Sequence, residues 1–227
     1  MLDKKEAIIF DLDGSLVDSM WVWTELDHRY MEKYKVGPVH EFQKEIEGMS
    51  FTETAQFFIE KFPQLNFTPG AVMYEWREMI IELYAHEVQL KPGAGAFLQQ
   101  MREKKMPMGI ATSNDREIVD VILHALHIQH YFSSIATACE VGAGKPAPDV
   151  YLKVADDLQI DPAKCLVFED IPAGIMAGKN AGMSVCAVED DFSKSDEQVK
   201  KNLADYCIHD YYDIANHTYE VCLHSTK

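Results

Sequence analysis

The feature that most constrains the fold is a series of short apolar runs separated by stretches with helical periodicity. Each run has about the length of a β-strand, and most are followed by polar or glycine-containing loops. Such alternation is typical of a mostly parallel sheet with helices on both faces, so we predict a doubly wound α/β core. The runs are Ala7–Phe10, Met108–Thr112, Ile135–Ala138, Cys165–Phe168, Ser184–Val188 and, more weakly, Tyr206–Ile208.

The stretch from residue 20 to residue 89 interrupts this alternation, because it holds helical patterns and no good strand candidate. A helical block placed after the first strand indicates an insertion. We therefore predict a small α-helical cap, residues 20–89, on a Rossmann-like core of residues 1–19 and 90–227. The expected cap helices are Trp21–Tyr34, Val39–Glu47, Thr52–Lys61 and Ala71–His86, and the expected tethers are Gly14–Ser19 and Gln89–Pro92.

Local signals mark where two of the cap helices begin. Ser50 and Glu53 have the spacing of a capping box, in which each residue satisfies a free backbone N–H group at the helix start. Thr68 followed by Pro69 fits an N-cap with proline at the first helical position.

The charge of the chain bears on its partners. The 227 residues carry a net charge of −16, which argues against nucleic acid and anionic membranes as partners. No apolar run is long enough to span a membrane, and the N-terminus does not resemble a signal peptide. The cysteines are odd in number and scattered, as in reduced proteins, so we expect a cytoplasmic protein, and we assume a monomer. They are Cys139, Cys165, Cys186, Cys207 and Cys222.

Two carboxylates, Asp11 and Asp13, follow the first expected strand directly. In an open parallel sheet, ligands bind beyond the carboxyl ends of the strands. Two acidic side chains held together there are unfavourable without a cation. With Mg²⁺ between them and a phosphate, one carboxylate can attack phosphorus while the other serves as acid and base. For this pair taken alone, an acidic loop that ends a strand is an equally good interpretation.

Further polar groups follow three later strands. Thr112 can donate to a phosphate oxygen, and the amides of Ser113 and Asn114 lie where a helix N-terminus favours an anion, although an ordinary N-cap explains them as well. Lys145 lies in a glycine- and proline-rich loop that suits a fixed positive charge, or else is an exposed lysine. Asp170 is the natural Mg²⁺ ligand, with Glu169 as a second ligand or an orienting group.

The ordered set of these motifs resembles the haloacid dehalogenase superfamily, and in particular its β-phosphoglucomutase-like branch with a helical cap. The segments DLDGSLVDS, GKPAPDVY and FEDIPAGIMAGKNAGM carry the resemblance, which covers nearly the whole chain. It implies a hydrolase with an Mg²⁺ cofactor and a small phosphorylated metabolite as substrate. The implied metal ligands are Asp11, the Asp13 carbonyl, Asp170 and Glu169. The resemblance also implies that Asp11 is the nucleophile, Asp13 the acid/base, and Thr112 and Lys145 phosphate-binding residues.

The expected reaction is hydrolysis of a phosphomonoester, such as that of a sugar or polyol, through an aspartyl-phosphate. In the resemblance, a β-phosphoglucomutase has a histidine where this chain has Trp23 and an arginine where it has Phe51, so the cap argues against a mutase. The loop residues Gly48 and Ser50 complete the expected substrate-contacting set. A sugar phosphomutase remains the alternative, followed by a non-catalytic phosphometabolite sensor. A phosphonate-cleaving enzyme would need a cap lysine such as Lys33 or Lys35, which we expect to be solvated.

Overall fold

The computed structural model describes residues 1–37 and 42–222 of the chain. Within these residues the strands form a seven-stranded sheet in the order β5-β4-β1-β6-β7-β8-β9. All neighbouring strands pair in parallel except β8 and β9, which are antiparallel. The strands are β1 (Ala7–Phe10), β4 (Met108–Thr112), β5 (Ser134–Thr137), β6 (Cys165–Glu169), β7 (Ser184–Val188), β8 (Tyr206–Ile208) and β9 (Glu220–Val221).

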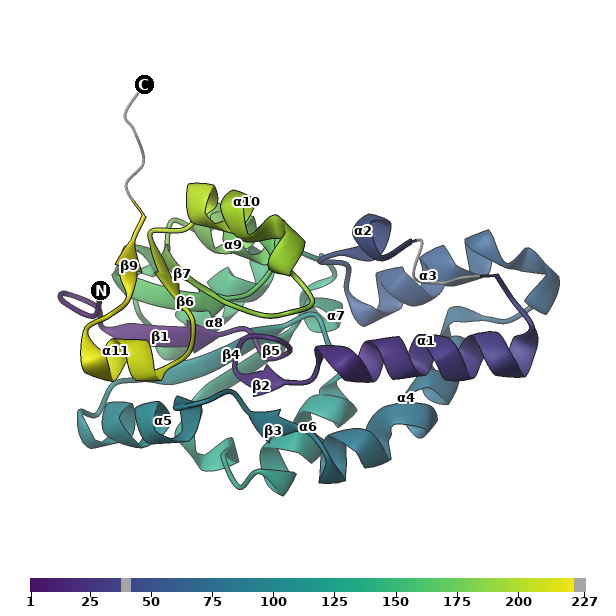
Figure 1. Cartoon of the computed structure of the whole chain (residues 1–227), viewed down its shortest axis with the longest axis horizontal. Helices are drawn as coiled ribbons and strands as arrows, with labels where there is room; N and C mark the ends of the chain where they lie inside the picture. The colour runs from purple at the N-terminus through teal and green to yellow at the C-terminus, as the bar shows by residue number, and fades with distance from the viewer. Residues whose placement is uncertain (38–41, 223–227) are drawn as a thin grey trace.

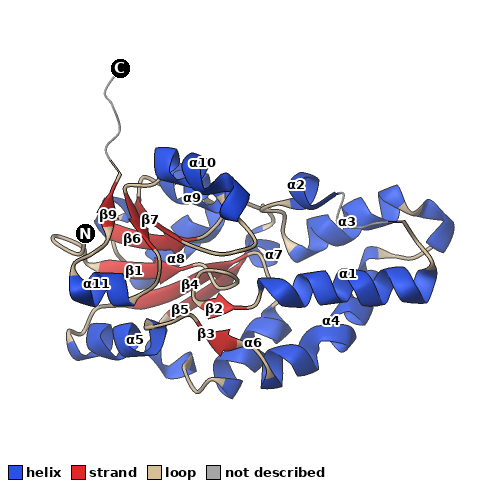
Figure 2. Cartoon of the chain, in the orientation of Figure 1, coloured by secondary structure: helices blue, strands red, loops and turns tan. Residues whose placement is uncertain are grey.

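Helices cover both faces of the sheet, which confirms the predicted doubly wound core (Figure 2). Apolar residues of one group pack with one face: α5 (Ala94–Glu103), α6 (Arg116–Ala125) and α11 (Tyr212–Asn216). The other face is covered by α8 (Asp149–Leu158), α9 (Pro172–Asn180) and α10 (Glu197–Leu203), and α7 (Ala138–Val141) follows β5. Short 3-10 turns span Pro63–Leu65, Gln129–Tyr131, Pro162–Lys164 and Lys194–Asp196.

Period-two burial along β1 explains how one strand serves both layers. Ile8 and Phe10 pack with one group of helices, whereas Ala7 and Ile9 pack with the other. Side chains of successive strand residues point to opposite faces, so a strand buried on both sides must be apolar throughout. Phe10 stacks on Phe168 with ring centroids 5.3 Å apart. The first five predicted strands therefore read as continuous apolar runs, and only the strand at 135–138 is displaced by one residue, to Ser134–Thr137.

The helices of residues 20–86 lie together beyond one end of the sheet, on the right in Figure 1. They are α1 (Met20–Tyr34), α2 (Gln43–Ile46), α3 (Phe51–Lys61) and α4 (Pro69–His86). The predicted capping box of Ser50 and Glu53 is present at the start of α3, and the Thr68 hydroxyl caps α4 ahead of Pro69. Of the helix predicted over 39–47, residues 39–41 lie outside the described residues.

The two segments that join these helices to the core pair with each other. They form a two-stranded antiparallel sheet of β2 (Val17–Asp18) and β3 (Gln89–Leu90). The Lys91 amide also donates to the Leu16 carbonyl at 2.9 Å. Because both connections are tied together, the helical segment enters and leaves the core at one place.

The helical segment also contacts the core directly. The Arg77 guanidinium of α4 donates two bonds of 3.0 Å to the Asp115 carboxylate at the start of α6. The Gly48 carbonyl accepts a bond from the Lys145 amide at 2.7 Å. Bidentate arginine–carboxylate pairs fix orientation as well as distance. These contacts hold the cap against the strand ends.

Across the part of the chain that the structure describes, no helix is both long enough and apolar enough to cross a membrane.

Candidate functional site

Four charged side chains predicted from three separate segments of the chain meet at the carboxyl edge of the sheet. Asp11 follows β1, Glu169 ends β6 and Asp170 comes next, while Lys145 lies in the loop after α7. The Lys145 ammonium lies 2.5 Å from Asp11 Oδ1 and 2.6 Å from Glu169 Oε1. All four side chains are buried. The order of the strands, with β1 between β4 and β6, brings these distant segments together.

Burial makes the charges of this cluster strongly interdependent. Desolvation raises the pKa of Asp11 to about 7, and Glu169 adds to this effect while Lys145 opposes it. Desolvation by itself would lower the pKa of Lys145, but the attraction of Asp11 and Glu169 outweighs it and raises that pKa. The cluster therefore contains a firmly held cation and an excess of carboxylates, which is unfavourable unless further positive charge binds.

Both oxygens of Glu169 already accept hydrogen bonds from the protein. Oε1 accepts from Lys145 and from the Tyr151 hydroxyl at 2.9 Å, and Oε2 accepts from the Asp170 amide at 2.9 Å. Gly174 makes room for this carboxylate, because a Cβ there would lie 1.7 Å from Oε1. This arrangement suits an orienting group that holds Lys145 better than it suits a direct metal ligand.

Asp170 offers the clearest candidate metal ligand. Its Oδ1 accepts a bond from the Ser15 hydroxyl at 2.9 Å, whereas its buried Oδ2 has no hydrogen-bond partner among the described residues. A buried carboxylate oxygen without a partner is costly unless an ion or water satisfies it. Burial, with Glu169 and Asp11 nearby, raises the pKa of Asp170 well above its usual value. Gly14, at φ +79°, leaves space beside Oδ2, since a Cβ there would lie 2.3 Å from it.

The donor set fits Mg²⁺. Carboxylate oxygens of Asp11, Glu169 and Asp170 lie within 4.8 Å of one another, and all three residues are buried. Mg²⁺ prefers hard oxygen ligands and is usually bound by few protein carboxylates. The carboxylates of Asp11 and Asp170 are therefore sufficient as its side-chain ligands. Because Glu169 is already fully engaged, these two are the side chains that would hold the ion.

Asp13 is held from three directions. Its Oδ1 accepts from the Ser19 hydroxyl and from the Tyr84 hydroxyl, each at 2.5 Å, and its Oδ2 accepts from the Asn114 amide group at 2.8 Å. Burial raises the pKa of Asp13, while these three hydrogen bonds oppose the shift. Ser19 belongs to the first tether and Tyr84 to α4, so the orientation of Asp13 depends on the position of the cap.

Thr112, which ends β4, and the next two residues, Ser113 and Asn114, have different roles. The Thr112 hydroxyl accepts a bond from the Asn114 amide at 3.1 Å, which leaves its own proton free to be donated into the cavity. The Ser113 hydroxyl donates to the Gly48 carbonyl at 3.2 Å, so it contacts the cap. The Asn114 side chain orients Asp13. Of the three predicted phosphate-binding groups here, Thr112 has the geometry best suited to that role.

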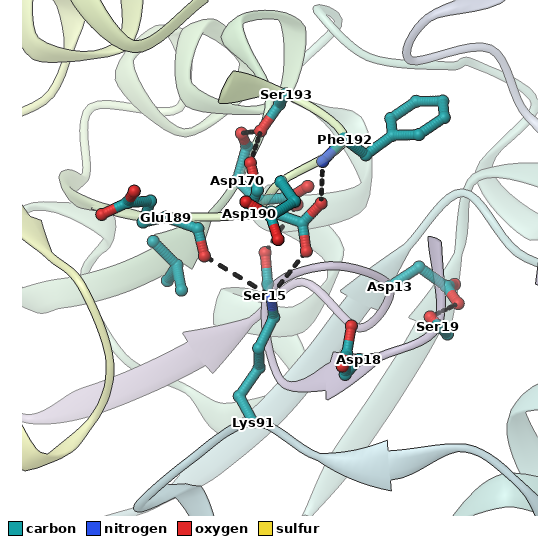
Figure 3. Close-up of polar contacts among 12 residues, drawn as sticks. Asp13, Ser15, Asp18, Ser19, Lys91, Asp170, Glu189, Asp190, Phe192 and Ser193 are labelled. Atoms are coloured by element: carbon teal, nitrogen blue, oxygen red, sulfur yellow. Dashed lines mark hydrogen bonds and ion pairs between the residues drawn. The ribbon is translucent and has the colours of Figure 1, made fainter. Parts of the chain in front are cut away.

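A buried ion pair lies next to the site (Figure 3). The Lys91 ammonium, from the second tether, lies 2.5 Å from Asp190 Oδ2 in the loop after β7. The other oxygen of Asp190 accepts a bond from the Phe192 amide at 2.9 Å. In the same loop the Ser193 hydroxyl donates to the Asp170 carbonyl at 2.7 Å. The pair therefore connects the tether to the loop that positions Asp170.

We expect Lys91→Met to lower the free energy of unfolding by about 3 kcal/mol, because it leaves the buried Asp190 carboxylate without its cation. Urea denaturation of the wild type and the variant measures the change. The double variant Lys91→Met/Asp190→Asn should regain much of the loss, because no unpaired charge remains. A loss below about 1 kcal/mol, as for an exposed pair, would contradict this role.

A cavity of about 300 Å³ lies between these strand ends and the cap. Asp11, Asp13, Thr112, Lys145 and Asp170 line its core side. The predicted cap residues Trp23, Gly48 and Phe51 line the opposite side. Ser50 is not among the lining residues, since its hydroxyl accepts the Glu53 amide at the start of α3. Lys33 also lies outside the lining and donates to Glu75.

Sequence reasoning missed several residues that complete the site. Tyr84 and Tyr151 hold Asp13 and Glu169, and Ser15 holds Asp170. Tyr84 lies on the buried face of a helix, and Tyr151 lies in the segment that contains Lys145. Their hydrogen-bond partners become apparent only in the folded protein. Ser15 is the exception, because it lies inside the motif of Asp11 and Asp13 and could have been examined as a ligand-holding group.

Comparison with known proteins identifies relatives of this chain and proteins with a similar fold. A probable pseudouridine-5'-phosphatase of Drosophila melanogaster is 29% identical over 91% of this chain and 93% of its own length. The (DL)-glycerol-3-phosphatase 2 of Arabidopsis thaliana is 30% identical over 88% of each protein. The fold is similar to that of a β-phosphoglucomutase from Clostridium difficile, with a TM-score of 0.77 and 23% identity over 92% of this chain and 93% of the other. Residues 8–188 match the family model of haloacid dehalogenase-like hydrolases, and the chain belongs to that family.

Proposed function

We propose that the protein is an Mg²⁺-dependent phosphomonoester hydrolase that acts on a small phosphorylated metabolite through an aspartyl-phosphate. One observation carries the proposal: Asp11 and Lys145 are in contact beside the Asp170 oxygen that has no hydrogen-bond partner among the described residues, and all three line one cavity. The names of two relatives, a pseudouridine-5'-phosphatase and a glycerol-3-phosphatase, support hydrolysis of a phosphate ester.

Each proposed step uses a group whose position favours it. Asp11 attacks phosphorus, and as the new O–P bond forms, the bond from phosphorus to the alcohol oxygen breaks. Asp13 gives its proton to that oxygen, and burial, which raises the pKa of Asp13, favours the protonated form that this requires. Water then attacks phosphorus and gives a proton to Asp13, which frees Asp11 and releases phosphate.

The remaining groups neutralise charge. Lys145 offsets the negative charge of the phosphate and of Asp11, and Thr112 donates a hydrogen bond to a phosphate oxygen. Mg²⁺, held by Asp11, Asp170 and the Asp13 carbonyl, would supply further charge neutralisation at the phosphoryl group. Glu169 keeps Lys145 in place. Since the substrate and the carboxylates are all anionic, these cations are needed for binding as well as for turnover.

A mutase is the weaker alternative, because it must also hold a second phosphate in the cap. The loop amides that could do so are engaged: Ser50 donates to Glu53, Phe51 to the Ser113 carbonyl and Met49 to the Ile46 carbonyl. A distal phosphate needs a cationic or multiple-donor clamp, which this loop does not offer. The third possibility, a non-catalytic sensor, requires binding without turnover.

Phosphate release in the presence of Mg²⁺, across a panel of sugar, polyol, nucleoside and aromatic monophosphates, tests the proposal. We expect release that stops on chelation with EDTA and returns with Mg²⁺. Conversion of β-glucose 1-phosphate to glucose 6-phosphate faster than phosphate release would establish the mutase instead. Binding of monophosphates without any turnover would establish the sensor.

Tyr84→Phe removes the hydroxyl that links α4 to Asp13 Oδ1. We expect kcat to fall by roughly 10- to 100-fold with little change in KM, because Asp13 loses orientation in the transition state while substrate binding persists. Steady-state kinetics with one good substrate measure this. The matched control is Tyr74→Phe, on the same helix and 60% exposed, which should behave as wild type. Equal rates for both variants would remove the proposed link.

A further inference from the structure

The cap side of the cavity is strongly aromatic. Trp23, Phe51 and Trp76 line it, with ring centroids 6.0 Å apart for Trp23 and Phe51 and 5.6 Å apart for Phe51 and Trp76. Trp23 is partly exposed, whereas Phe51 and Trp76 are largely buried beside it. Phe57 and Met49 also line the cavity, and both are partly exposed there. Apolar side chains normally avoid water, so an aromatic wall around a ligand cavity indicates a ligand with apolar surface.

Several polar side chains on this side already have protein partners, and Lys44, which is largely exposed, forms an ion pair with Asp196 at 3.6 Å. The Thr54 hydroxyl donates to the Ser50 carbonyl at 3.1 Å, and Glu47 accepts a bond from the Ala173 amide at 3.4 Å. Lys61 pairs with Glu45 at 3.2 Å, and its ammonium lies 4.8 Å from the centre of the Phe57 ring. A sugar or polyol bound here would lose hydrogen bonds to water and regain few, which costs affinity.

We infer that the cavity selects a phosphomonoester whose alcohol carries an aromatic ring close to the phosphate, in preference to a sugar or polyol phosphate. This inference rests on the proposed function. Phosphate binds at Asp11, Thr112 and Lys145, and the ring packs against Trp23 and Phe51. A volume of about 300 Å³ is at the lower limit for ligand pockets, so a single ring on a short link fits best.

Four phosphates of primary alcohols test the inference, because their leaving groups have similar intrinsic reactivity. They are benzyl phosphate, 2-phenylethyl phosphate, glycerol 3-phosphate and glucose 6-phosphate. We expect kcat/KM for the better aromatic ester to exceed that for either polyol ester by roughly 10- to 100-fold, since filling an apolar pocket discriminates on that scale. Higher kcat/KM for a polyol ester would overturn the inference while leaving the proposed hydrolase intact.

Comparison of Trp23→Leu with Trp21→Leu tests whether Trp23 causes the preference for an aromatic ester. Both tryptophans lie on α1, but Trp21 does not line the cavity and is 39% exposed. We expect Trp23→Leu to reduce kcat/KM for benzyl phosphate by about 10-fold and to change that for glycerol 3-phosphate much less, and Trp21→Leu to change neither. Equal losses of kcat/KM for the two esters in Trp23→Leu would show that Trp23 does not recognise the aromatic ring.

Binding without turnover gives an independent readout. Calorimetric titration of the wild type with benzylphosphonate and with methylphosphonate, in Mg²⁺, should show tighter binding and a more negative heat-capacity change for the benzyl compound, because it buries apolar surface. Equal affinities for the two phosphonates would overturn the inference even if hydrolysis is observed. If no phosphomonoester at all is hydrolysed, the proposed function fails, and this inference fails with it.

Discussion

Asp11→Asn is expected to reduce phosphate release by at least about 10⁴-fold, since loss of a nucleophile removes the covalent route altogether. An amide oxygen is a poor nucleophile, and the variant keeps the shape of the side chain. Burial already raises the pKa of Asp11 to about 7, so the carboxylate is held in an environment that disfavours its charge. The measurement is Mg²⁺-dependent phosphate release with the best substrate of the panel.

The fold of this variant should survive, which separates chemistry from stability. Removing one carboxylate from beside Glu169 and Asp170 relieves like-charge repulsion, while Lys145 keeps its bond to Glu169. We expect the midpoint of thermal unfolding, measured without metal, to shift by no more than roughly 4 °C, which corresponds to about 1 kcal/mol for a chain of this size. Asp120→Asn, an exposed position on α6, is the matched control. Retained activity in Asp11→Asn would mean that another group is the nucleophile.

Lys145→Met should lower kcat by about 10³-fold, the upper range for loss of one preorganised charge-stabilising group. The buried ammonium offsets the charges of Asp11 and Glu169 and, in the proposed mechanism, that of the phosphate. Methionine has a similar length and no charge. The two carboxylates would then face each other without a cation, so we also expect a loss of stability of about 3 kcal/mol, partly recovered by Mg²⁺.

Two measurements distinguish these effects. Steady-state kinetics at saturating Mg²⁺ report the catalytic loss, and urea denaturation with and without Mg²⁺ reports the stability loss. Lys153→Met serves as the control, because Lys153 is half exposed and pairs with Asp157 on the surface of α8. If Lys145→Met retained more than about one tenth of the wild-type kcat, Lys145 would not be the phosphate-binding cation of this site.

Glu169 and Asp170 illustrate what adjacency in sequence leaves undecided. Both lie at the end of the same strand and both are carboxylates, so the sequence allows either as a metal ligand. In the folded protein Glu169 receives Lys145, Tyr151 and the Asp170 amide, whereas Asp170 Oδ2 lacks a hydrogen-bond partner within the described residues. The two carboxylates differ in their surroundings, and those surroundings come from segments far away in the chain.

The cap also combines features that the sequence predicts with features that only the folded protein shows. Helix starts were predicted well, because Ser50 with Glu53 and Thr68 with Pro69 act on neighbouring backbone groups. The expectation of a sugar or polyol phosphate as the substrate rests only on the family resemblance. The aromatic wall of Trp23, Phe51 and Trp76 comes from three helices. The sequence predicts that Trp23 and Phe51 contact the substrate, but only the folded protein shows that they lie together with Trp76.

The sequence by itself determined the strands, the helical insertion and the set of strand-end groups, because these depend on apolar periodicity and on local hydrogen bonds. Only the tertiary structure decided which groups meet. Lys145 and Asp11 are 134 positions apart, Tyr84 and Asp13 are 71 apart, and Lys91 and Asp190 are 99 apart. Such pairs are set by strand order and by the seating of the cap on the core, and no local pattern encodes the distance between two side chains that the fold brings together.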